Sequence, residues 1–141
     1  MLSSINVTSK SWVYNQYDQN VGTDVVNGVG GDAGIMRLKD EPSVRVAMTT
    51  NGNGLFTKSN PRRGVQAAVA ECYRNLACVG AKPLAITNCL NFGNPERPAI
   101  MSQFVSVIEG MGEACEAFES PVISGNVSLY NQHNEDDIPP T

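Results

Sequence analysis

The sequence predicts an α+β fold in which two long helices cover one face of a mixed sheet of four to five strands. Two segments have apolar residues at the spacing of an amphipathic helix, and a short apolar run typical of a buried strand separates them. Ahead of them, a strand-like stretch and an alternating one flank a turn, which predicts a β-hairpin. Helices stacked on a sheet are the layer arrangement that fits this order.

The two long helices are the clearest elements. The first is expected over 64–79, with one apolar face: Val65, Val69, Cys72, Leu76 and Val79. The second is expected over 98–118, with Pro98 near its start, where a missing N–H costs little. Its apolar stripe is longer: Ile100, Phe104, Val107, Ile108, Met111, Cys115 and Phe118.

The other elements are shorter. Strands are expected at 33–38, 44–50, 83–87 and 121–124, with room for a last one near 127–130; a short helix is expected over 9–19 and a polar loop over 51–61. The continuous apolar run at 83–87 indicates burial on both sides of that strand. The second face of the sheet therefore needs a partner, either a missing domain or a second sheet.

Composition and charge exclude several classes of protein. The 141 residues are 41% apolar and carry a net charge of −4 without a Lys/Arg-rich stripe, so neither a nucleic-acid nor an anionic-membrane partner is expected. The four cysteines form no CxxC motif and the single histidine is His133, so neither a zinc nor a thiol-redox site is expected. Free cysteines on apolar helix faces suit a reducing cytosol, and we expect a cytoplasmic protein.

The length fits a single domain over 1–141. Within it we expect a glycine-rich opening segment at 20–32, an αβ core at 33–131 and a tail at 132–141. Because the tail reads as strand-like and ends without a terminal element, we expect a part of a longer protein.

Two short motifs carry candidate metal and phosphate ligands. Gly28, Gly30 and Gly31 lead to Asp32, and such a loop can bring backbone N–H groups to a phosphate while the carboxylate holds Mg²⁺. A plain turn is the alternative. Glu71 and the residue four positions on, Asn75, share a helix face and could ligate a hydrated cation together; a solvated helix surface is the alternative.

Asparagines follow the two apolar strands. Asn88 and Asn91 come after the first strand and Asn126 after the second, where α/β proteins place ligands and where amides can both donate to and accept from a nucleotide. Ordinary turn formation by Asn and Gly would explain them as well. Arg62 and Arg63 could steer a phosphate toward the following helix, although the sequence favours a solvated loop there.

Several segments together resemble one enzyme family over roughly residues 5–131. They lie at 9–14, 16–18, 30–33, 68–71, 74–83, 87–96 (Thr-Asn-Cys-Leu-Asn-Phe-Gly-Asn-Pro-Glu) and 124–131 (Ser-Gly-Asn-Val-Ser-Leu-Tyr-Asn). The resemblance is to phosphoribosylformylglycinamidine synthase, the amide-to-amidine ligase of purine biosynthesis. It is closest to the N-terminal domain of the second half of the small bacterial-type large subunit, in the aminoimidazole ribonucleotide synthetase superfamily. The segment at 49–54 departs from the family pattern, which usually has an Asp and an Asn-Pro there.

This resemblance implies a fold, cofactors and partners. It implies a sheet that pairs with a second copy into a barrel-like pseudo-dimer, and an auxiliary site for Mg²⁺ with ATP or ADP whose metal ligands match Asp32, Glu71 and Asn75. The implied partners are the rest of the same subunit, a glutaminase subunit, a small bridging subunit and formylglycinamide ribonucleotide. The family's His-rich catalytic motif is missing, so the chain alone should be inactive.

Two alternatives remain at this point. The domain could be a non-catalytic scaffold with a degenerate site, or a different superfamily member such as a selenophosphate or thiamine-phosphate kinase. Those kinases need an aspartate-rich active site, and this chain offers only Asp32 in the right setting. A homodimer of the chain through its uncovered sheet face is also expected.

Overall fold

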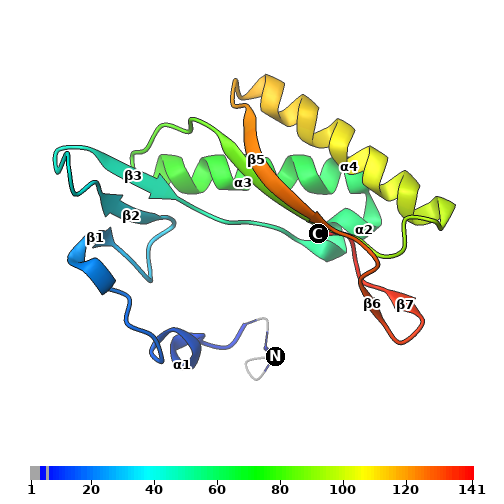
Figure 1. Cartoon of the computed structure of the whole chain (residues 1–141), viewed down its shortest axis with the longest axis horizontal. Helices are drawn as coiled ribbons and strands as arrows, with labels where there is room; N and C mark the ends of the chain where they lie inside the picture. The colour runs from blue at the N-terminus through cyan, green and yellow to red at the C-terminus, as the bar shows by residue number, and fades with distance from the viewer. Residues whose placement is uncertain (1–3, 6) are drawn as a thin grey trace. The chain divides into compact units, whose positions relative to one another are not determined.

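The computed structural model describes residues 4–5 and 7–141 (Figure 1). These residues form two compact units, with the boundary between residues 49 and 50. The boundary between the units falls inside the expected core at 33–131. The expectation of one domain therefore stays a prediction.

The first unit holds a three-stranded antiparallel sheet. It is formed by β1 (Val25–Asn27), β2 (Gly34–Arg37) and β3 (Arg45–Met48), with β2 in the middle. The expected hairpin is confirmed, since Ile35 pairs with Ala47 across β2 and β3. Sequence reasoning missed β1, because its apolar residues are only two and lie within a glycine-rich stretch.

Helical structure in the first unit is shorter than expected. The helix predicted over 9–19 is the single turn α1 (Ser11–Tyr14), followed by the 3₁₀ turn η1 (Val21–Thr23). Trp12 is 77% exposed and Tyr17 69% exposed, so these two aromatic side chains make little packing contact within this unit. A helix of one turn fixes several dihedral angles for few hydrogen bonds, which makes it marginal without packing.

The second unit combines two long helices with a parallel strand pair. Its elements are α2 (Gly54–Ser59), α3 (Pro61–Cys78), β4 (Ile86–Asn91), α4 (Pro98–Ala117), β5 (Val122–Ser128), β6 (Gln132–His133) and β7 (Asp136–Asp137). β4 and β5 run side by side along α3 and α4 (Figure 1). Both long helices were predicted within a few residues of their observed ends.

The core of the second unit confirms that both helices pack on the same face of the strand pair. Its buried members come from α3, α4, β4 and the loop after β4: Val65, Leu90, Phe92, Ile100, Val107, Met111 and Cys115. Phe92 is fully buried, and its ring meets the Phe104 ring edge-on with 5.1 Å between the ring centroids. Such a pair stabilises the fold by about 0.5–1.5 kcal/mol beyond the contribution of the buried area. Ile108 and Phe118 of the expected stripe stay exposed.

The expected sheet of four to five strands is wrong for the described residues. Their strands are divided among a three-stranded sheet, the parallel pair β4–β5 and the short hairpin β6–β7, and these sheets are open rather than closed into a barrel. An apolar pattern predicts that a strand exists, but not which strand it pairs with. Pairing of the sheet with a second copy stays a prediction.

The face of the strand pair away from the helices differs from expectation. It carries small, mostly polar residues that lie opposite one another in register: Thr87 and Ser124, Cys89 and Asn126, Asn91 and Ser128. Burial of this strand on both sides is therefore wrong within this unit, since Thr87 and Cys89 are exposed. The apolar residues exposed on β5 are Val122, Ile123 and Val127.

A short helix replaces most of the loop predicted over 51–61. Asn53 caps the first turn of α2, because its side-chain oxygen accepts hydrogen bonds from the N–H groups of Leu55 (3.1 Å) and Phe56 (3.2 Å). Asn60 caps α3 in the same way through Arg63 N–H at 3.0 Å, with Pro61 in the first helical position. Two asparagines of this segment, Asn53 and Asn60, are thus helix caps.

The segment at 132–141 is packed into the second unit rather than extended as a tail. After the β6–β7 hairpin, Asn91 and Thr141 exchange two backbone hydrogen bonds of 2.7 and 3.0 Å, and Pro140 is fully buried. His133 is exposed.

Two cysteines lie on the apolar helix faces, where the sequence predicted them. Cys115 is buried and Cys72 half-buried, both as free thiols, and burial raises the pKa of each. Across the described residues we find no helix with the length and apolar character needed to cross a membrane.

Candidate functional site

The three asparagines proposed to contact nucleotide lie within strands, not in the loops after them. Asn88 and Asn91 belong to β4 and Asn126 to β5, because the parallel pairing extends both strands beyond their apolar runs. Asparagine is a poor strand former, and here the pairing overrides that propensity. The expected loop positions of these residues are therefore wrong.

The strand register divides these asparagines between two faces. Asn91 and Asn126 lie on the polar face, while Asn88 lies on the helix side, where its amide nitrogen is 3.7 Å from the sulfur of Met111. Asn88 and Asn126 both line an open cavity of about 460 Å³ beside β5, together with Leu90, Phe104 and residues 122–125 and 127. A cavity of this size is in the range of small-molecule sites.

The segments that follow β4 and β5 are joined at the carboxyl edge of the strand pair. Phe92 N–H donates to the carbonyl of Ser128 at 2.9 Å, and Tyr130 N–H donates to the carbonyl of Gly93 at 2.8 Å. Asn131 N–H donates in turn to the carbonyl of Phe92 at 3.1 Å. The two motifs most typical of the resembled family therefore form one structural edge.

Two side chains that sequence reasoning missed hold this edge. The amide nitrogen of Asn131 donates to the carbonyls of Ser128 (2.9 Å) and Phe92 (3.1 Å). Asp137, from the segment taken as a tail, accepts from Asn94 N–H at 2.9 Å and pairs with Arg97 at 2.7 Å. Nothing in the local sequence around 137 signals this long-range contact.

The hydrogen bonds to Asp137 have an electrostatic consequence. The N–H of Asn94 and the side chains of Gln132 and Arg97 all stabilise its ionised form, which lowers the pKa of that carboxyl. Gly93 lies directly against it, since a Cβ at position 93 would sit 2.2 Å from an Asp137 carboxylate oxygen. The loop after β4 is thus fixed by a charge and by close packing.

The glycine loop of the first unit forms a turn. Gly31 N–H reaches the carbonyl of Gly28 at 3.4 Å, and Gly30 has φ +100°, a conformation that side chains rarely adopt. Asn27 lies beneath it, with its amide donating to the carbonyl of Ala33 at 3.3 Å. Gly28, Gly30 and Gly31 are all exposed, so their backbone is accessible to an anion.

The proposed metal ligands are divided between the units. Asp32 is exposed at the end of the glycine loop in the first unit. In the second unit, Glu71 and Asn75 lie one turn apart on α3; Glu71 is exposed and Asn75 half-buried. Two carboxylates and an amide oxygen are hard oxygen donors of the kind that Mg²⁺ takes.

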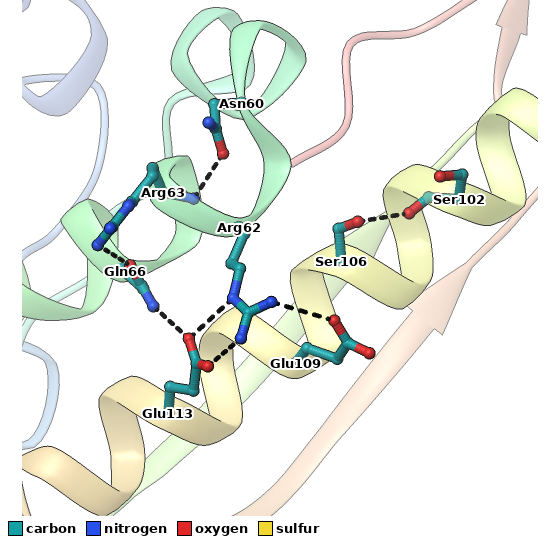
Figure 2. Close-up of polar contacts among 8 residues, drawn as sticks. All are labelled: Asn60, Arg62, Arg63, Gln66, Ser102, Ser106, Glu109 and Glu113. Atoms are coloured by element: carbon teal, nitrogen blue, oxygen red, sulfur yellow. Dashed lines mark hydrogen bonds and ion pairs between the residues drawn. The ribbon is translucent and has the colours of Figure 1, made fainter.

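Arg62 and Arg63 belong to α3 and have protein partners. Figure 2 shows the Arg62 guanidinium held by Glu113 and Glu109 of α4, with Gln66 donating to Glu113 at 2.7 Å and Arg63 donating to Gln66 at 3.1 Å. The hydrogen bond between Arg62 and Glu113 raises the pKa of the arginine and lowers that of the glutamate. Arg62 therefore links the two helices, and its charge is compensated rather than directed at a phosphate.

Residues 30–141 match the family model for the AIR synthase related protein, N-terminal domain. The chain belongs to this family. Over all 141 residues it is 53% identical to the phosphoribosylformylglycinamidine synthase subunit PurL of Moorella thermoacetica, of which it covers 19%. It is 56% identical to the PurL of Aquifex aeolicus over 138 residues, covering 94% of this chain and 18% of the relative.

Solved structures agree with this assignment. A chain in the structure of PurLQS from Thermotoga maritima superposes with a TM-score of 0.86 at 36% identity, covering 94% of this chain and 22% of that one. T. maritima PurL complexed with AMPPCP gives a TM-score of 0.81 at 36% identity, over 94% of this chain and 23% of that one. The chain thus spans about a fifth of its relatives, and these identities favour the synthase over the kinase alternatives.

Proposed function

We propose that this chain is a domain of phosphoribosylformylglycinamidine synthase, and that it supplies an auxiliary Mg–nucleotide site and a sheet interface. The single observation that carries the proposal is the 53% identity to a PurL subunit along the whole chain. The parent reaction converts formylglycinamide ribonucleotide to the amidine, with ATP and with ammonia from glutamine. Phosphoryl transfer of this kind depends on positioning and on Mg²⁺ to offset charge.

The proposal includes the rest of the assembly. Partners would be the remaining domains of the same subunit, a glutaminase subunit, a small bridging subunit and formylglycinamide ribonucleotide, in the cytoplasm. T. maritima PurL has been solved in complexes with ATP, ADP and FGAR, and a PurLQS structure exists for the same organism, which supports this set. The chain alone would be inactive, because it is about a fifth of such a subunit.

In this proposal Asp32, Glu71 and Asn75 hold Mg²⁺. Support comes from the donor chemistry and from the exposure of both carboxylates, with Glu71 one helical turn from Asn75. Within the described residues Glu71 makes no ion pair with Arg74, so its neighbour does not neutralise it. When bound, the metal would offset the charge of the nucleotide phosphates.

Two further sets of residues would contact the nucleotide itself. Gly28, Gly30 and Gly31 would give backbone N–H groups to a phosphate, supported by the exposed turn that they form. Asn88 and Asn126 would meet the ligand at the cavity beside β5, and Asn91 at the polar face that it shares with Asn126.

Calorimetric titration of MgADP into the chain tests the nucleotide site. We expect binding that requires Mg²⁺ and that Glu71→Gln weakens at least tenfold, because a carboxylate ligand becomes a neutral amide. Glu116→Gln is the matched control, an exposed helix glutamate with the same charge change, and it should leave affinity within twofold. No heat at millimolar MgADP would contradict the site and favour the scaffold alternative.

We also propose a homodimer of the chain. The sequence suggested the uncovered sheet face as its interface, and in the structure the free edge of β5 supports such a contact. β5 pairs only with β4 among the described residues, and its seven residues include no charge that would oppose addition of another strand. Its exposed Ile123 and Val127 add apolar area beside that edge.

A further inference from the structure

Tyr130 has an unusual backbone conformation for an aromatic residue. Its φ is +60°, and the other non-glycine described residues with positive φ are Thr23, Glu119 and Asn134. Glu119 follows the end of α4 and Asn134 lies in the β6–β7 turn, two places where the left-handed conformation is common. Tyr130 has no such local reason, and for a bulky side chain this conformation costs free energy.

Hydrogen bonds from three sides hold Tyr130 in this conformation. Its own N–H donates to the carbonyl of Gly93 at 2.8 Å. The backbone N–H of the next residue, Asn131, donates to the carbonyl of Phe92. It therefore makes no hydrogen bond back to the carbonyl of Ser128, as it would in an ordinary β-turn. The side-chain amide of Asn131 takes that place instead and donates to the carbonyl of Ser128 at 2.9 Å. The conformation is thus imposed by the joined edge of β4 and β5.

Packing of the ring does not compensate for this cost. Tyr130 is 58% exposed, whereas Phe92 beside the same edge is fully buried. Phe92 and Phe104 contact each other, as do Tyr73 and Phe118, but the Tyr130 ring has no aromatic partner among the described residues. Strain that is held in place without a packing gain is typical of residues that contact a ligand.

We propose that Tyr130 is a ligand-contacting residue whose ring stacks on the flat base of the bound nucleotide. It lies at the carboxyl edge of two parallel strands, two residues past the end of β5, which is where such sheets place ligands. An aromatic face accepts a heterocyclic base without requiring a specific hydrogen-bond pattern. The inference rests on the proposed nucleotide site and adds the residue that would hold the base.

The test compares Tyr130→Gly with Tyr130→Phe in the whole chain, measuring both MgADP affinity and the melting temperature. Glycine relieves the left-handed conformation, so the melting temperature should stay the same or rise while the affinity falls at least tenfold. Phenylalanine keeps the ring and should bind MgADP within twofold of the wild type. A residue with a merely structural role would lower stability and affinity together.

Each other outcome overturns the inference in a distinguishable way. If the wild type and Tyr130→Gly bind MgADP equally, the ring is not a contact, while the proposed nucleotide site stands. If Tyr130→Gly lowers both the melting temperature and the affinity, the role is structural. If the wild type itself does not bind MgADP, the proposed site fails and this inference fails with it.

Discussion

At the candidate site, the absence of a side chain at Gly125 allows β5 to pack closely against β4. Gly125 of β5 lies opposite Asn88 of β4, and a Cβ at position 125 would sit 1.9 Å from the Asn88 side-chain oxygen and 2.8 Å from its backbone oxygen. The Asn88 amide can therefore lie across β5 only because residue 125 has no side chain. From the sequence this glycine could belong to a ligand-binding loop or to a turn, whereas in the structure it allows close packing within a strand.

Gly125→Ala should destabilise the chain. The new methyl group meets backbone as well as side-chain atoms, and overpacking of this kind costs about 1–3 kcal/mol. Gly112→Ala is the control, and it should change stability in the opposite direction. No atom lies within 4 Å of the Cβ position of residue 112 in α4, so alanine should stabilise this helix by about 0.5–1 kcal/mol. Urea unfolding of both variants measures the difference. Equal effects on stability would contradict the packing argument.

The carboxyl group of Asp137 should make stability depend on acid pH. Its pKa is lowered in the folded chain, chiefly by the N–H of Asn94, so its contribution is present above the ordinary aspartate pKa of about 3.9. That contribution is lost as the pH falls through the folded value. In thermal melts from neutral to acid pH, the melting temperature of Asp137→Asn should fall less than that of the wild type. Asp136→Asn, an exposed neighbour, should follow the wild type.

At the scale of elements, the long amphipathic segments were predictable and the strand limits were not. α3 and α4 follow from their apolar spacing, because burial of one face dictates that pattern in the sequence itself. β4 extends through Asn88 and Asn91 because β5 pairs with it, and that partner lies more than 30 residues away in the chain. The holding roles of Asn131 and Asp137 were missed for the same reason.

α2 should depend on its cap. Asn53 accepts two N–H groups at the start of a six-residue helix, so Asn53→Ala should cost about 1 kcal/mol of stability. Asn51→Ala, two residues earlier and outside the helix, should change stability by less than about 0.5 kcal/mol. Chemical denaturation of the two variants gives the comparison, and an equal loss would contradict the capping role.

At the scale of the whole molecule, β5 pairs on one side only among the described residues, and Ile123 and Val127 are exposed beside its free edge. Sedimentation of the chain over a range of concentrations should show a dimer that Ile123→Lys abolishes, because a charge on β5 opposes strand addition. Lys82→Ala, at an exposed residue outside β5, would serve as a control. A wild-type monomer at every concentration would refute the homodimer.

The family itself was predictable from motifs, since the segments at 87–96 and 124–131 carry it and they form one edge in the structure. The sheet arrangement was not, because partner strands are chosen by three-dimensional packing that no local pattern encodes. The division of the candidate ligands between two units also lies beyond local sequence.

A crystal structure of the chain grown with MgADP tests the central claim most directly. The account predicts a Mg²⁺ ion about 2.0–2.1 Å from a carboxylate oxygen of Glu71, with nucleotide phosphates bound to the same ion. Mg²⁺ bound without Glu71, or a nucleotide bound away from it, would contradict the account.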